Sequence, residues 1–155
     1  MARITCKTPS TGKGISVTMV DVTTSFTVIA EAPDFSVPDP SNNYSERDPQ
    51  DDSRAIRPGE VFFITPIAAK NKTSNTYWIE VQLVTESNVV VDFGRVTVPA
   101  NDTAFIPLQG RSLFKRNANT AISGDTIQIR AQANSVFDVW AAAEEKLSNE
   151  HVGVQ

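Results

Sequence analysis

The sequence predicts an all-β fold: an antiparallel β-sandwich, immunoglobulin-like or jelly-roll, with about eight strands. Apolar and polar residues alternate along several short segments, and this period of two is typical of half-buried strands. Turn-forming residues separate these segments at regular intervals. The 155 residues suffice for one domain with a hydrophobic core but are few for two, so we expect a single domain over residues 1–155.

The N-terminal part of the sequence predicts strands at residues 15–22 and 25–32. A shorter strand is expected before them, at residues 4–7. Cys6 in that strand is the only cysteine, which excludes an internal disulfide and a cysteine-based metal site. A lone cysteine of this kind is typically a small buried apolar residue.

Residues 33–59 interrupt the regular pattern. The segment contains five prolines, and residues 34–60 hold seven acidic residues against three arginines. A loop of this length inside a compact domain is either functional or disordered. We expect an ordered Pro/Asp-rich insertion, an extended arm that lies on its own domain or on a neighbouring molecule.

The rest of the chain predicts the other strands and their turns. We expect strands at residues 60–68, 76–85, 89–98, 103–107, 126–133 and 136–145. The turns fall at residues 72–75, 86–88, 99–102, 124–125 and 134–135. Pro107 lacks a donor, so its strand ends there or lies at an edge.

The last segment has a helical alternative, because the run from Ala141 to Leu147 consists of good helix formers. The alternation of Phe137, Val139 and Ala141 with polar or larger residues favours a strand. Asn134-Ser135 would then close a hairpin between the last two strands.

Two tryptophans fall on strand faces that they share with charged or amide residues. Trp78 shares a face with Glu80, and Trp140 shares one with Asp138. Indole rings on a polar face are unusual unless something covers them. Three interpretations remain open: cover by residues 33–59 or by a different strand register, a protein-interface anchor, or a platform for sugar rings.

The charge of the chain argues against nucleic-acid binding. The net charge is −4 with a pI near 4.9, and the basic residues are scattered. The only local basic cluster is Arg111, Lys115 and Arg116, which is either a solvated loop or a contact to an acidic partner. No apolar run is long enough to span a bilayer, and residues 1–14 lack a secretory signal. We therefore expect a protein made in a cytoplasm, without membrane contact.

No catalytic set is evident in the sequence. His151, the only histidine, lies five residues from the end, where a general base is poorly held. The carboxylate pairs Asp51-Asp52 and Glu144-Glu145, and Glu80 with Asp92, are explained as solvated faces. The acidic run around Asp51 lacks the spacing of a calcium loop, and Gly12-Lys13-Gly14 lacks the context of a phosphate loop. We expect a non-enzymatic protein with no metal and no cofactor.

Five runs carry a resemblance to a known class of proteins: TSFTVIAEAP from residue 24, YWIEVQLV from residue 77, RVTVPANDTAFIPLQG from residue 95, GDTIQIRAQA from residue 124 and VFDVWAAAEE from residue 136. They resemble small virion structural proteins of tailed bacteriophages. The resemblance implies a sandwich domain attached to the particle, without enzymatic activity and most simply a capsid decoration or cement protein. A tail, neck or fibre accessory protein, or a carbohydrate-binding module for host adhesion, is the alternative.

The partners implied are the major capsid protein or neck and tail proteins, together with further copies of the chain. Localisation would be the virion. The residues expected to contact partners are Trp78, Trp140, Phe35, Tyr44, Asp51, Asp52, Arg54, Arg111, Phe114, Lys115 and Arg116.

Overall fold

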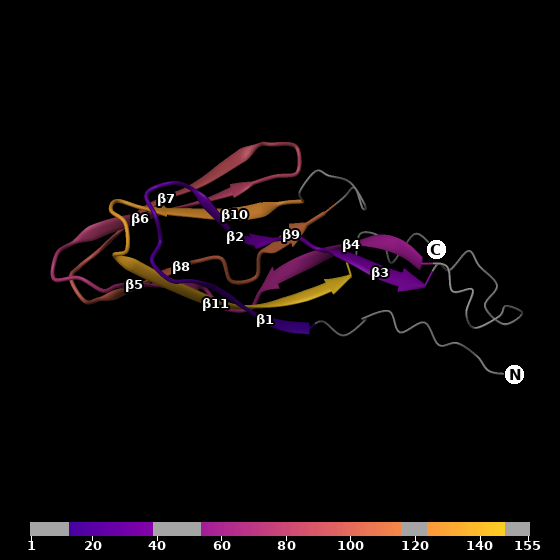
Figure 1. Ribbon diagram of the computed structural model, residues 1–155, viewed down its shortest axis with the longest axis horizontal. Helices are drawn as coiled ribbons and strands as arrows, with labels where there is room; N and C mark the ends of the chain where they lie inside the picture. The colour runs from indigo at the N-terminus through magenta and orange to yellow at the C-terminus, as the bar shows by residue number, and fades with distance from the viewer. Residues whose placement is uncertain (1–12, 39–53, 116–123, 148–155) are drawn as a thin grey trace, which may run out of the picture.

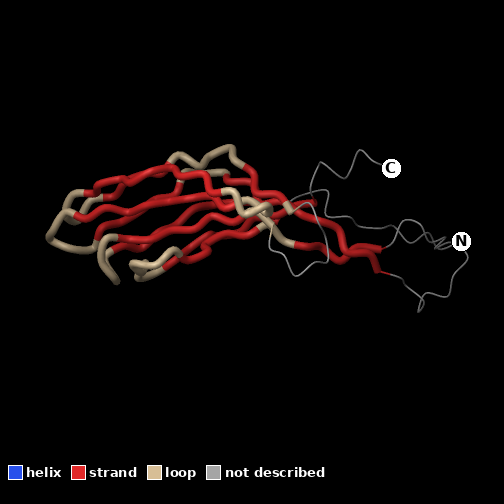
Figure 2. Tube along the Cα trace, turned by 90° about the horizontal axis from the view of Figure 1, so that it is seen from above, coloured by secondary structure: helices blue, strands red, loops and turns tan. Residues whose placement is uncertain are grey.

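A computed structural model describes residues 13–38, 54–115 and 124–147, and it confirms the predicted all-β fold (Figures 1 and 2). Within these residues, eleven strands form two antiparallel sheets. The same residues contain no helix, and so none that is long and apolar enough to cross a membrane. The sheets pack face to face as a sandwich.

The larger sheet has seven strands arranged around one long strand, β11 (Phe137–Leu147). One side of β11 pairs with β1 (Lys13–Met19). The other side pairs with β4 (Arg54–Phe63) toward its C-terminal end and with β5 (Ile67–Asn71) toward its N-terminal end. The sheet is completed by β3 (Asp34–Pro38) and β9 (Ser112–Phe114), which pair with β4, and by β8 (Thr103–Ile106), which pairs with β5.

The smaller sheet has four strands. Its order is β2 (Thr27–Glu31), β10 (Thr126–Ala131), β6 (Tyr77–Val84) and β7 (Val90–Val98). β2 and β7 therefore form its two edges.

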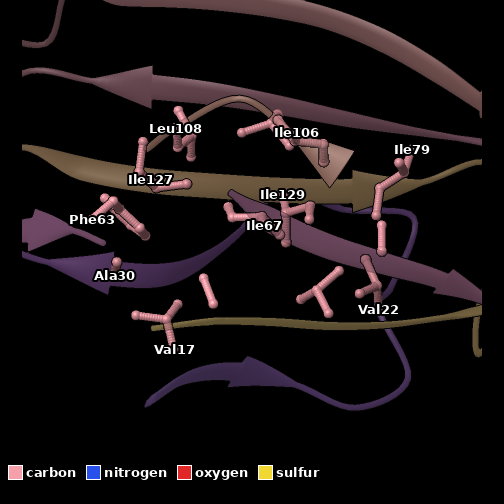
Figure 3. Close-up of a cluster of buried hydrophobic side chains, with 14 of the residues drawn as sticks. Val17, Val22, Ala30, Phe63, Ile67, Ile79, Ile106, Leu108, Ile127 and Ile129 are labelled. Carbon is pink, nitrogen blue, oxygen red and sulfur yellow. The ribbon is translucent and has the colours of Figure 1, made fainter. Parts of the chain in front are cut away.

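The alternation in the sequence places the core as expected. Ile79 and Val81 of β6 are buried, as are Phe137, Val139 and Ala141 of β11. Side chains from both sheets meet between the layers, and Figure 3 shows them, with Phe63, Ile67, Ile106, Leu108, Ile127 and Ile129 among the labelled residues. The strand interpretation of the last segment is thus confirmed over the helical alternative, because only a strand buries every second residue here.

One expected strand is in fact two. Residues 60–68 do not form a continuous strand: β4 ends at Phe63 and β5 begins at Ile67. Between them, the N–H groups of Ile64 and Thr65 both bond to the carbonyl of Ala142. The Thr65 hydroxyl accepts a bond from the Ala142 N–H, and Pro66 has no donor to continue a ladder. The chain bends here, so the two strands pair with different parts of β11.

The expected hairpin at Asn134-Ser135 is also wrong. β10 and β11 lie in different sheets, and the turn carries the chain from the smaller sheet to the larger one. The backbone groups at the ends of the two strands bond instead to the loop after β1: the Ala131 N–H donates to the Thr23 carbonyl, and the Val22 N–H donates to the Phe137 carbonyl. This loop occupies the place where a hairpin ladder would continue.

Residues 33–59 are not a loop throughout. β3 pairs with the first half of β4 from Asp34 opposite Pro58 to Pro38 opposite Arg54. The two strands form a ribbon that projects beyond one end of the sandwich (Figure 1). A strand that the sequence did not predict, β9, also pairs with β4. The short strand expected at residues 4–7, the acidic residues 39–53 and residues 148–155 lie outside the described residues.

Candidate functional site

The outer face of the larger sheet carries an exposed aromatic pair. Trp140 of β11 is 47% exposed, and Phe105 of β8 is 66% exposed. Each is out of phase with buried neighbours: Val139 and Ala141 flank Trp140, and Ile106 follows Phe105. Because side chains alternate along a strand, both rings belong to the face that points away from the core.

The strand register places these rings in one straight row. Trp140 lies opposite Thr18 of β1 on one side and opposite Ala68 of β5 on the other, and Ala68 lies opposite Phe105. Two strand spacings separate Trp140 from Phe105, so their backbones are about 10 Å apart. We call Thr18, Trp140, Ala68 and Phe105 the outer aromatic row. Because the side chain of Ala68 is small, it leaves space between the rings of Trp140 and Phe105.

A further exposed apolar residue, Ile64, lies near the outer aromatic row. Ile64 is 43% exposed, and its N–H bonds to the carbonyl of Ala142, two residues beyond Trp140 in β11. Scattered exposed apolar residues are ordinary on protein surfaces, but a cluster on one flat sheet face marks an interaction site.

A charged row borders the other side. Asp138 of β11 lies opposite Lys70 of β5, which lies opposite Thr103 of β8. The Lys72 ammonium bonds to both Asp21 and Asp138, and lies 3.0 Å from the Asp138 carboxylate. The Lys70 ammonium bonds to the Asn101 carbonyl. The face therefore combines an apolar centre with a polar border.

The Lys72 cluster shifts two pKa values in opposite directions. Hydrogen bonds to Asp21 and then to Asp138 raise the pKa of Lys72. Desolvation by itself would raise the pKa of Asp138. The backbone N–H of Asp21 and the Lys72 ammonium outweigh it, so the pKa of Asp138 lies below its ordinary value. Both groups are charged at neutral pH.

Trp78, the other tryptophan, is covered by its own sheet. The Arg95 guanidinium lies 4.0 Å from the centre of the indole ring, and Arg130 lies 5.9 Å away. Both arginines also reach Glu80, with nitrogen–oxygen distances of 3.6 Å and 2.7 Å. Of the three interpretations of the tryptophans, cover thus applies to Trp78, but the covering residue is Arg95 of the neighbouring strand.

Cations also cover aromatic rings elsewhere, in both sheets. Cations lie over Phe26, Phe62 and Phe93 as well: Arg130 at 4.4 Å, Lys146 at 5.3 Å and Arg111 at 4.8 Å from the ring centres. Among the residues that the structure describes, no cation lies over Trp140 or Phe105. Within this part of the chain, Trp140 and Phe105 are the exposed large aromatic side chains.

The other residues expected to contact partners do not gather at this face. Phe35 and Arg54 lie on the projecting β3–β4 ribbon. Arg111 is exposed, Phe114 is half-buried in β9 and Lys115 is only 7% exposed, so the expected basic cluster is divided. Tyr44, Asp51, Asp52 and Arg116 lie outside the described residues.

Phe105 was missed by the sequence reasoning. The sequence did carry a signal for it. Successive side chains of a strand point to opposite faces, so Phe105 lies on the face opposite that of its neighbours Ala104 and Ile106. Its position in one row with Trp140 required the register of three strands, β11, β5 and β8.

Neither a metal-binding cluster nor a facing pair of Glu80 and Asp92 forms among the described residues. They contain no group of three His, Cys, Asp or Glu residues that could hold a metal ion. Glu80 lies opposite Arg95, and Asp92 lies opposite Gln82, so these two carboxylates are not a facing pair. His151 and Cys6 lie outside the described residues.

Comparisons with known proteins found no match: no family model, no curated protein and no solved structure is significantly similar to this chain.

Proposed function

We propose that this protein is a non-enzymatic structural subunit of a tailed-phage particle, a capsid decoration or cement protein that binds a neighbouring virion protein. The observation that carries the proposal is the exposed pair Trp140 and Phe105 on the outer face of the seven-stranded sheet. Aromatic residues are enriched at the energetic centres of protein interfaces. The polar border around Asp138 and Lys70 matches the usual anatomy of an apolar centre inside a polar rim.

The partner would contribute an apolar side chain that fills the space above Ala68, between the two rings. Such contacts are modest singly, and repetition over a symmetric particle multiplies them through avidity. The resemblance of the strand sequences to virion proteins supports the same role. A tail, neck or fibre position would use the same face.

The test is binding to particles of the phage that encodes this chain, prepared without it. Trp140→Ser and Phe105→Ser should each reduce occupancy strongly while the circular dichroism spectrum and melting temperature stay unchanged. Val28→Ser is the matched control, because Val28 is an exposed apolar residue on the opposite sheet. Full occupancy with both aromatic residues removed would refute the proposal.

The projecting ribbon suggests a second contact with the particle. A two-stranded ribbon is marginally stable by itself and is expected to gain stability from docking. Replacing residues 36–56 with a two-residue Asn-Gly turn shortens the ribbon but leaves Gly59–Phe63 paired with β11. Occupancy should fall; unchanged occupancy would remove the ribbon from the interface.

A carbohydrate-binding module is the second candidate, favoured by one observation. Trp140 lies beside hydrogen-bonding groups, with Asp138 two residues away on the same face. An indole ring next to polar groups can stack on a sugar ring and orient it. Glycan-array binding that is lost in Trp140→Ala, with particle binding unchanged, would select this candidate over the first.

A further inference from the structure

The smaller sheet has an open edge at β7. Its order places β7 last, and among the described residues no strand pairs with the outer side of β7. An edge strand presents unpaired N–H and C=O groups, which can pair with a strand from another chain. Figure 1 shows β7 at the border of the molecule, beyond β6.

The start of β7, together with Val89 just before it, has an apolar surface. Val89, Val90 and Val91 are 56%, 54% and 40% exposed, and no charge interrupts them. The second half is protected. The ladder with β6 is irregular there, the Gly94 N–H bonds to the Asp92 carboxylate at 2.7 Å, and Arg111 lies over Phe93. Bulges and charges are common means of blocking edge pairing.

The other edges of the sandwich are shorter or more polar. β2 has five residues and an irregular register with β10. β8 has four residues. β1 exposes Lys13, Ser16 and Thr18. The valine half of β7 is therefore the edge best suited to accept another strand.

The hydrogen bonds of Val89 show which residues at the start of β7 direct their backbone N–H and C=O groups to the open edge. The Val89 carbonyl accepts a bond from the Thr85 N–H at 2.9 Å, and the Val89 N–H donates to the Thr85 hydroxyl at 3.0 Å. Both groups of Val89 thus face β6. Because successive residues of an antiparallel strand direct these groups to opposite sides, Val90 and Asp92 direct theirs to the open edge.

We propose that β7 pairs antiparallel with β7 of a second copy of this chain, with the two Val91 residues opposite each other on a two-fold axis. In this register, Val90 of each copy exchanges backbone hydrogen bonds with Asp92 of the other. A shift by two residues in one direction would place the two Asp92 carboxylates opposite each other. A shift the other way would pair Asp92 with Asn88, whose φ of 62° belongs to the turn. Only the register with the two Val91 residues opposite each other avoids both the repulsion between carboxylates and the pairing with a turn residue.

The same register also matches the side chains. Val91 meets Val91 of the second copy on the sheet face that it shares with Leu83, its partner in β6, so the apolar row continues from one copy into the other. The smaller sheets of the two copies become one continuous sheet. This inference uses neither the outer aromatic row nor the phage assignment, and it would leave the row exposed for a different partner.

Cysteine cross-linking tests the register. In a Cys6→Ser background, Val91→Cys should form a disulfide-linked dimer under mild oxidation. Facing residues of a non-hydrogen-bonded antiparallel pair have α-carbons about 4.5 Å apart, which suits a disulfide. Val90→Cys is the control, because its counterpart in the second copy is displaced by two residues. Equal cross-linking of the two variants, or none by Val91→Cys, would overturn the proposed register.

Sedimentation equilibrium tests the association itself. The unmodified chain should shift from monomer to dimer mass as concentration rises. Val91→Lys should abolish the dimer, since two lysines would face each other across the axis. Val28→Lys, the same substitution on the opposite edge of the same sheet, should retain it. A monomer at all concentrations, or a dimer that survives Val91→Lys, would refute the proposal.

Discussion

The side-chain amide of Asn71 donates a hydrogen bond to the backbone carbonyl of Val98 at 3.0 Å, joining the larger sheet to the smaller one. Asn71 ends β5, is fully buried and also donates to the carbonyls of Asn75 and Pro99. The side-chain oxygen of Asn71 accepts hydrogen bonds from the backbone N–H and the hydroxyl of Thr73. One side chain thus organises the turns at this end of the sandwich.

Asn71→Ala should lower the free energy of unfolding by about 3 kcal/mol, because it leaves several buried backbone groups without partners. Urea denaturation measures the change. Asn75→Ala is the control: Asn75 is exposed, and its contribution to Asn71 is through its backbone carbonyl. A loss below 1 kcal/mol for Asn71→Ala would show that water replaces the amide.

Asp125 joins the two sheets through a corresponding contact. Its carboxylate accepts bonds from the N–H of Glu86 at 3.0 Å and from the N–H of Phe114 at 3.1 Å, linking the turn after β6 to β9. Asp125→Ala should destabilise the fold by about 2–3 kcal/mol. Hydrogen exchange should show faster exchange at the amides of Glu86 and Phe114 than at Val98, and uniform acceleration would contradict a local role.

The Lys72 cluster predicts a specific pH dependence. The lowered pKa of Asp138 contributes stability above its unfolded value near 3.8, and this contribution is lost as pH falls through the folded value. The raised pKa of Lys72 contributes below 10.5, and that contribution is lost as pH rises through the folded value. Both contributions to the free energy of unfolding are therefore fully present between about pH 5 and pH 10.

Asp138→Asn should reduce the loss of stability between pH 7 and pH 3, measured as the change in the urea midpoint of unfolding. Because the side chain is 38% exposed, solvent screening keeps the effect below about 1 kcal/mol. Ser16→Ala, an exposed substitution in β1 that removes no charge, should leave the profile unchanged. If Asp138→Asn retains the full acid dependence, other carboxylates account for it.

Removing Arg95 should expose Trp78. In a Trp140→Phe background, which leaves Trp78 as the only tryptophan, Arg95→Ala should increase acrylamide quenching and shift the emission to the red. The stability cost should be about 0.5–1 kcal/mol, typical of a cation–π contact at a partly exposed site. Arg57→Ala on the projecting ribbon is the control, and an equal spectral change there would argue against direct cover by Arg95.

Much of the fold could be predicted from local patterns. The strands β6, β7, β8, β10 and β11 lie within two residues of their expected bounds, since alternation and turn residues are encoded in neighbouring positions. The inward direction of Ile79 and Val81 and the outward direction of Trp140 follow from the same period. The split between β4 and β5 was less accessible, because the bend depends on a bond between Thr65 and Ala142, 77 residues apart.

The sequence by itself determined that this chain is all-β and which residues of the clearly alternating strands, β6 and β11, face the core. The tertiary structure decided which sheet each strand joins, because a period of two looks the same in either layer and the Asn134-Ser135 turn is compatible with both. It also decided which aromatic residues stay exposed. Trp78 and Trp140 have similar local surroundings in the sequence, but only the strand register places Arg95 beside one and Phe105 in a row with the other.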